Sequence, residues 1–160
     1  MKKTAIGIGV IAFIVVVAIV FLLISLVGGK TAITADEFIE IMEDEGYDVE
    51  VETGDDNMFG AVKAAMIGDD EFMVVFCEFE SEKDAKNLFK TTTESFEIDE
   101  LKDEDDVDFK TVETDSYTVY EIVGEGGYAY IARVENTLFY VVGEDDSQDK
   151  LEDIVDAIGY

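Results

Sequence analysis

The sequence predicts an α+β fold, in which an antiparallel sheet is packed by helices. Short segments alternate apolar and polar residues, as half-buried strands do, and Gly, Asp and Asn separate them. Segments with apolar residues every third or fourth position precede, interrupt and follow these strands. We expect an N-terminal transmembrane helix, then one domain with an antiparallel sheet of about six to seven strands and three helices.

The N-terminal segment is long, apolar and uncharged. Residues 4–29 carry no charge, and the core of this segment would span roughly 34 Å as a helix, enough for a hydrocarbon layer of about 30 Å. A secretory signal has a shorter apolar region followed closely by a cleavage site with small residues. The best such site here ends at Ala35, well beyond the apolar segment. We therefore expect an uncleaved anchor over 4–29.

Basic residues define the expected orientation of this anchor. Lys2 and Lys3 precede it, and the residues that follow it are soon acidic. The positive-inside rule then puts residues 1–3 in the cytoplasm. A short linker, 30–33, is expected to lead to an extracytoplasmic domain, 34–160, so that the protein crosses the plasma membrane once.

The first half of this domain is expected to contain one helix and three strands. Thr34 suits the N-cap of the helix, and Gly46 suits the position just after it. Strands are expected at 47–53, 61–68 and 71–79. The third is apolar on both faces, which indicates a central strand covered on both sides. Its two faces consist of Met73, Val75, Cys77 and Phe79, and of Phe72, Val74 and Phe76.

The second half is expected to contain a helix, an antiparallel meander and a last helix. Ser81 suits the N-cap of the first of these helices, and an acidic loop without clear periodicity follows at 97–108. The last helix is expected to begin near Ser147 and to end at Gly159. The expected strands between them are 108–114, 117–123, 128–135 and 137–142.

The charge of the chain excludes several classes of partner. The sequence has 39 acidic and 11 basic residues, a net charge of −28, and all the acids follow the apolar segment. Nucleic acids and anionic lipid surfaces both require a basic face. The charge favours cationic partners. An alternative is that it only reflects a saline or cation-rich habitat.

Side chains typical of catalysis and metal binding are scarce. The chain has no histidine, and its single cysteine, Cys77, lies on an apolar strand face, where burial raises a thiol pKa. No nucleotide-binding or nucleophile motif occurs, and the acidic segments lack the EF-hand pattern. We expect no enzyme activity, catalytic residue, cofactor or specific metal site. Loose association of divalent cations at 103–108 or 144–149 remains an alternative.

Arg133 is the only arginine and the single candidate ligand-binding residue. It lies on an expected strand, on the face that carries Ala129 and Ile131. An arginine there requires a carboxylate partner. A structural partner within the domain is the favoured interpretation. The alternative, a ligand carboxylate, requires a pocket beside Arg133.

Three stretches carry a resemblance to a known group of domains. They are "TADEFIEIMEDEGYDVE", "FCEFESEKDAKNLF" and "ARVENTLFYVVGEDDSQDKLEDIVDAIGY". Their order resembles that of small uncharacterised extracytoplasmic domains of Gram-positive, Clostridia-like bacteria, which are carried on a transmembrane or lipoprotein segment. The resemblance implies location and fold, and it carries no activity or functional residue. The absence of any intrachain disulfide or N-glycosylation site also favours a prokaryotic source.

These observations lead to three functional hypotheses. The first is a non-catalytic, membrane-tethered extracytoplasmic domain that binds or senses a protein or a cationic ligand in the cell envelope. The second is a hydrolase of envelope polymers that uses carboxylates alone, which requires two carboxyl groups about 5 to 10 Å apart in a cleft. The third is a structural spacer or cation-associating surface. The oligomeric state is not predicted.

Overall fold

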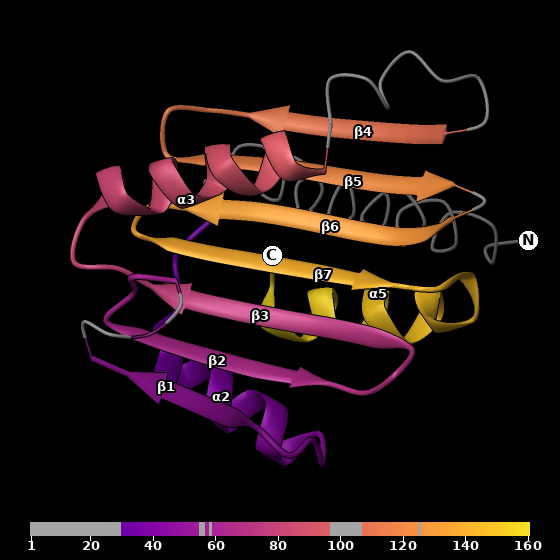
Figure 1. Ribbon diagram of the computed structural model, residues 1–160, viewed down its shortest axis with the longest axis horizontal. Coiled ribbons are helices and arrows are strands. Elements are labelled where there is room, and N and C mark those ends of the chain that lie inside the picture. The colour runs from indigo at the N-terminus through magenta and orange to yellow at the C-terminus, as the bar shows by residue number, and fades with distance from the viewer. Residues whose placement is uncertain (1–29, 55–56, 58, 97–106, 125) are drawn as a thin grey trace, which may run out of the picture.

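The computed structural model describes residues 30–54, 57, 59–96, 107–124 and 126–160, and within them it confirms the predicted α+β fold. Seven antiparallel strands form one sheet in the order β1-β2-β3-β7-β6-β5-β4 (Figure 1). The expected anchor at 4–29 and most of the expected loop at 97–108 lie outside the described residues. The elements are α2 (Ala35–Asp44), β1 (Glu50–Thr53), β2 (Lys63–Gly68), β3 (Phe72–Glu78), α3 (Glu82–Ser95), β4 (Val107–Glu113), β5 (Tyr117–Gly124), β6 (Gly127–Val134), β7 (Thr137–Gly143), the short 3-10 helix η1 (Asp145–Ser147) and α5 (Gln148–Ile158).

Pairing of β3 with β7 joins the two halves of the sheet. The strands β1, β2 and β3 form one antiparallel meander, and β4 to β7 form a second. Seven residue pairs, from Phe72 opposite Gly143 to Glu78 opposite Thr137, connect the two. The helix α3 links the meanders along the chain. The expectation that β3 is a central strand is therefore confirmed.

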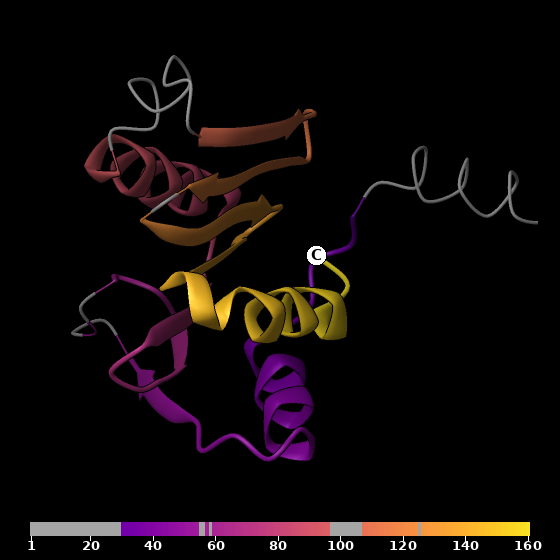
Figure 2. The ribbon, with the colours of Figure 1, turned by 90° about the vertical axis from the view of Figure 1, so that its right-hand side faces the viewer.

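One face of the sheet is covered by α2 and α5, and the other carries α3 (Figure 2). The first interface is rich in aromatic rings. Phe38 of α2 stacks on Phe76 of β3 with 4.9 Å between ring centroids, and Phe139 of β7 packs 6.1 Å from Phe38. None of these three side chains is exposed. We call this side the closed face.

Thr34 and Gly46 stand at the start and the end of α2, as the sequence predicts. The Thr34 hydroxyl accepts a hydrogen bond from the Glu37 backbone N–H, and the Glu37 carboxylate accepts one from the Thr34 N–H, which completes a capping box. Gly46 has a φ of 89°, a left-handed conformation that suits glycine. None of the helices in the described part of the chain is both long and apolar enough to span a bilayer.

Two strands begin two or more residues later than expected, and side-chain or backbone hydrogen bonds explain both differences. The expected strand at 47–53 begins at Glu50, because the Tyr47 N–H donates back to the Met42 carbonyl and ends α2. The expected strand at 61–68 begins at Lys63. The Asn57 side chain accepts hydrogen bonds from the backbone N–H of Phe59 and Ala61 and so holds these residues in a loop.

The chain enters the domain at a buried corner of the closed face. The Ile33 backbone N–H donates to the Tyr160 hydroxyl at 3.3 Å, and the same hydroxyl lies 2.8 Å from the hydroxyl of Thr137 on β7. The Ala35 N–H donates to a Glu78 carboxylate oxygen at 2.8 Å. These bonds attach Ile33 and the first residue of α2, Ala35, to the strands β7 and β3.

Candidate binding site

The helix α3 covers only part of its side of the sheet. Residues that share a face line up across the strands, so two rows can be compared. The helix packs on β6 and β7. In the row that passes the N-terminal end of α3, the buried residues are Ala64, Cys77, Leu138, Arg133 and Thr118. In the row nearer the β2–β3 turn, Met73 is 42% exposed, and Val142 and Ala129 are half-buried. We call this side the open face.

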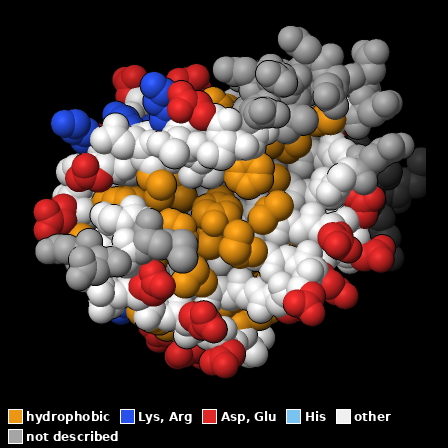
Figure 3. Space-filling model, in the orientation of Figure 1, with side chains coloured by type: hydrophobic (Ala, Val, Ile, Leu, Met, Phe, Trp, Pro, Cys, Tyr) orange, Lys and Arg blue, Asp and Glu red, His pale blue; other side chains and the backbone are white. Residues whose placement is uncertain are grey.

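Apolar side chains gather at the centre of the open face, and acidic side chains surround them (Figure 3). The β1–β2–β3 end of the sheet carries a pocket of about 380 Å³ that opens to solvent. We call it the edge pocket, since β1 is one of the two edge strands of the described sheet. Its lining residues are Asp48, Glu50, Met66, Ile67, Gly68, Asp69, Phe72 and Met73.

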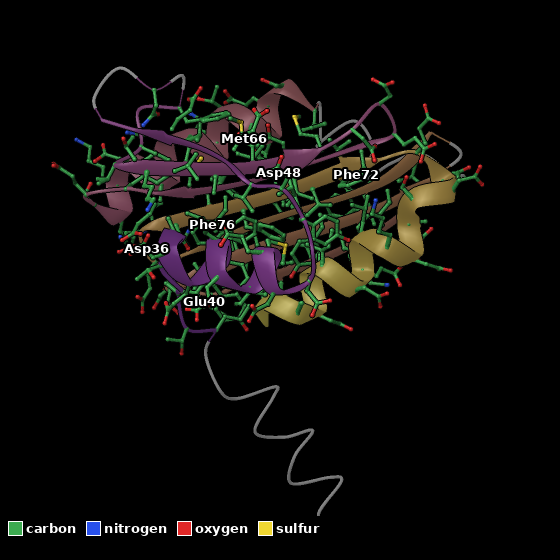
Figure 4. The ribbon with its side chains drawn as sticks, turned by 90° about the horizontal axis from the view of Figure 1, so that it is seen from below. Asp36, Glu40, Asp48, Met66, Phe72 and Phe76 are labelled. Carbon is green, nitrogen blue, oxygen red and sulfur yellow. The ribbon has the colours of Figure 1, made fainter. Side chains whose placement is uncertain are left out.

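Strand register places the lining residues of the edge pocket. Glu50 lies opposite Met66 across β1 and β2, and Gly68 lies opposite Met73 across β2 and β3. Side chains at alternate positions share a face. Met66 therefore lies on the open face, on the side of the sheet away from Phe76 (Figure 4).

Gly68 and Asp69 shape the turn at the edge of the pocket. A Cβ atom on Gly68 would lie 2.6 Å from the carbonyl oxygen of Phe72, so only glycine fits without a shift of the turn. The Asp69 carboxylate accepts hydrogen bonds from the backbone N–H of Glu71 and Phe72. The turn thus holds Phe72 in place and leaves no side chain at position 68.

The carboxylates of the edge pocket differ in their partners. The second Asp69 oxygen lies 3.8 Å from the ammonium of Lys150 on α5, which also lies 3.9 Å from the centroid of the Phe72 ring. Asp48 and Glu50 are exposed. Within the described part of the chain, neither forms an ion pair. The pocket therefore combines an apolar lining with two carboxylates that no described cation neutralises.

A second, smaller pocket lies between α2 and α5 on the closed face. It measures about 280 Å³. Its lining residues are Met42, Glu45, Tyr47, Lys150, Asp153, Ile154 and Ala157. The Lys150 ammonium already lies over the Tyr47 ring, 5.7 Å from its centroid, so this pocket contains its own cation.

Arg133, the candidate predicted from sequence, lies beneath the N-terminal end of α3 and is only 3% exposed. Its guanidinium lies 3.3 Å from the Glu82 carboxylate and donates to the Ser116 carbonyl at 3.2 Å and to the Thr118 hydroxyl at 3.5 Å. Arg133 is absent from the linings of the two pockets described above. Lys86 and then Arg133 hold the pKa of Glu82 below its usual value.

The sequence pattern did not identify the edge pocket. Its acids are common in this chain, and the exposure of Met66 and Met73 depends on where α3 ends over the sheet. With the strand register known, the pocket can be recognised from the sequence. Met66 and Met73 lie on one face of the neighbouring strands β2 and β3, and the acidic edge strand β1 lies beside them.

Cys77 has the environment of an unreactive thiol. It is fully buried, and burial raises its pKa to about 12. Among the described residues, no three acidic or cysteine side chains are grouped so as to hold a metal ion. Loose cation association at 103–108 is one of the alternatives from the sequence, and residues 103–106 of this segment lie outside the described residues.

Comparison with known proteins adds no function. No family model matches the chain, and no curated protein matches it. Among solved structures, a GTP-binding regulator from Thermotoga maritima is 16% identical, with a TM-score of 0.48 over 81% of this chain and 87% of that one. The extracellular domain of PknH from Mycobacterium tuberculosis is 10% identical, with a TM-score of 0.38 over 79% and 89%. Likenesses this distant carry no argument about the site.

Proposed function

We propose that this protein is a non-catalytic, single-pass membrane-tethered domain. In this proposal residues 4–29 anchor it, and the domain lies outside a prokaryotic plasma membrane and binds a protein or cationic ligand of the cell envelope. The observation that carries the proposal is the open face, where exposed apolar residues lie beside Asp48 and Glu50, two carboxylates without an ion pair in the described part of the chain. A folded domain keeps such a surface at a cost in solubility, which is typical of an interaction site.

The attachment of the linker supports this arrangement. Residues 32 and 33 pack against the closed face, so the chain leaves the domain on that side (Figure 2). Four linker residues, 30–33, reach at most about 14 Å. With an anchor at 4–29, the bilayer would therefore lie near the closed face, and the open face would be directed away from it.

The carboxylate-based hydrolase is the weaker alternative. A general acid requires a carboxyl group whose pKa is raised. The pKa of Glu37 is lowered by the Thr34 N-cap, and that of Glu82 is lowered by Lys86, which is the opposite of what a general acid requires. Both shifts are explained by structural contacts.

Protease accessibility in intact cells tests the proposal. The full chain with a C-terminal epitope tag would be expressed in a bacterial host, and protease would be added with and without detergent permeabilisation. We expect loss of the tag in intact cells while a cytoplasmic marker stays intact, and a mature N-terminus that precedes the apolar segment. A protected tag, or a mature N-terminus near Asp36, would overturn the proposed topology.

A further inference from the structure

We propose that the edge pocket binds a lysine or arginine side chain from an extended segment of a partner protein, with an apolar residue beside it. This inference rests on the proposed function and specifies its site and ligand chemistry. The pocket of about 380 Å³ falls within the usual range for ligand sites, about 300 to 1,000 Å³.

The apolar lining of the pocket suits the stem of a long basic side chain. Lysine and arginine lay their methylene groups along apolar surface and keep the charged end in water. Met66 and Met73 offer flexible, polarisable side chains for this contact, and Met73 is already 42% exposed. A neighbouring apolar residue of the partner would cover the rest of this surface.

Charge complementarity selects a cation. Asp48 and Glu50 line the pocket without an ion pair in the described structure, and no described lysine or arginine belongs to its lining. The net charge of −28 adds a long-range attraction for basic segments. A partly desolvated cation between two carboxylates gains more than it would at a fully exposed site.

The chain itself shows the same chemistry next to the pocket. The ammonium of Lys150 lies over the Phe72 ring and near Asp69, and both of these residues also line the edge pocket. Lys150 offsets part of the charge of Asp69. The carboxylates left to attract a partner are therefore Asp48 and Glu50.

A protein segment fits the pocket better than a free metal ion does. A hydrated ion gains nothing from methionine side chains, and the described residues contain no metal-binding group of three acids. The pocket also adjoins β1, and an edge strand presents backbone groups that an extended segment can pair with. We therefore infer a segment that runs beside β1 and inserts one basic side chain.

Fluorescence anisotropy with defined peptides tests this inference on the full chain in nanodiscs of neutral lipid. The probe is a labelled peptide, GKTLTKTLG, in which lysine and leucine stand two residues apart and so share one face of an extended segment. A peptide of equal charge with serine in place of leucine, GKTSTKTSG, and an acidic peptide, GETLTETLG, serve as comparisons. We expect the leucine–lysine peptide to bind most tightly and the acidic peptide not to bind.

Matched variants separate the pocket from the general charge of the protein. Asp48→Asn with Glu50→Gln should weaken binding of the leucine–lysine peptide roughly tenfold, as expected for the loss of two ion pairs. The control Glu40→Gln with Glu43→Gln removes two exposed charges from α2 and should change binding less than about twofold. Met66→Ser with Met73→Ser should abolish the preference for the leucine–lysine peptide over the serine–lysine peptide.

Equal losses in the two charge-removing variants would overturn the inference, as would a wild-type protein that binds both lysine peptides equally. Either result would leave the proposed location intact, because the protease experiment tests that separately. Near-ultraviolet circular dichroism would establish that each variant is folded before binding is measured.

Discussion

We propose that the two faces of the sheet divide stability and binding between them. On the closed face, two helices bury Phe38, Phe76 and Phe139 completely. On the open face, α3 packs on β6 and β7 above Arg133, and the sheet remains accessible at Met73 of β3. Alternate side chains of a single strand, β3, therefore serve different purposes. Dense packing on one side allows the other side to keep an exposed surface without loss of the fold.

Removal of an aromatic ring from the closed face should have the largest effect on stability. Phe76→Ala leaves a cavity against Phe38, Phe139 and Tyr160, whose ring centroids lie 4.9, 6.4 and 6.2 Å away. We expect the free energy of unfolding to fall by about 3–5 kcal/mol. Denaturant titration of the full chain in detergent, followed by circular dichroism, measures this change. A loss below that of the open-face variant Met73→Ser would contradict the division.

Loss of the buried arginine beneath α3 should have an intermediate effect. Arg133→Ala removes a donor to the Ser116 carbonyl, which keeps its hydrogen bond from the Glu135 N–H, and empties the space under the helix. We expect a cost of about 2–3 kcal/mol. Glu82→Gln should cost less, since Glu82 is 45% exposed and also pairs with Lys86. The same denaturant titration compares them. A larger loss for Glu82→Gln would show that the ion pair matters more than burial.

Loss of the Thr34 cap should weaken the closed face at its edge. Thr34→Ala removes the hydroxyl that accepts from the Glu37 N–H, and we expect a cost of about 1 kcal/mol, with Thr34→Ser close to wild type. Backbone donation from Thr34, and then its hydroxyl, lower the pKa of Glu37. The contribution of this carboxylate is therefore present above its unfolded pKa and disappears as pH falls through the folded value. Denaturant titrations at several acidic pH values measure this contribution. A difference in the free energy of unfolding between wild type and Thr34→Ala that grows as the pH falls would contradict this assignment.

The smallest effect on stability is expected on the open face itself. Met73→Ser removes a side chain that is already partly exposed, and we expect a cost below about 1 kcal/mol. The same variant should lower the affinity for the leucine–lysine peptide. A large loss of stability would show that the exposed methionine is part of the core, and the open face would then lose its assigned purpose.

The fold could be predicted from sequence because its local signals agree with its tertiary contacts. Alternation along 71–79 indicated a central strand with two apolar faces, and β3 has both. Thr34 and Ser81 both cap helices as predicted. Strand starts were less well predicted, because they depend on a hydrogen bond that the Tyr47 N–H donates and on hydrogen bonds that the Asn57 side chain accepts, which no pattern of apolar residues encodes.

The candidate site could not be predicted in the same way. The one residue that stood out by rarity, Arg133, lies in the covered row and contacts other residues of the domain. The edge pocket depends on strand register, which places Met66 beside Glu50, and on the place where α3 stops covering the sheet. Both are results of three-dimensional packing between segments far apart in sequence.

The corner where Ile33 meets Tyr160 has a mechanical consequence. With an anchor upstream, any tension between the bilayer and a captured partner would enter the domain at this point. The load would be shared at once by the Tyr160 side chain, by Thr137 of β7 and by Glu78 of β3. The domain would then resist unfolding from its first helix. Tension on a partner bound at the opposite side would not first unfold the binding surface.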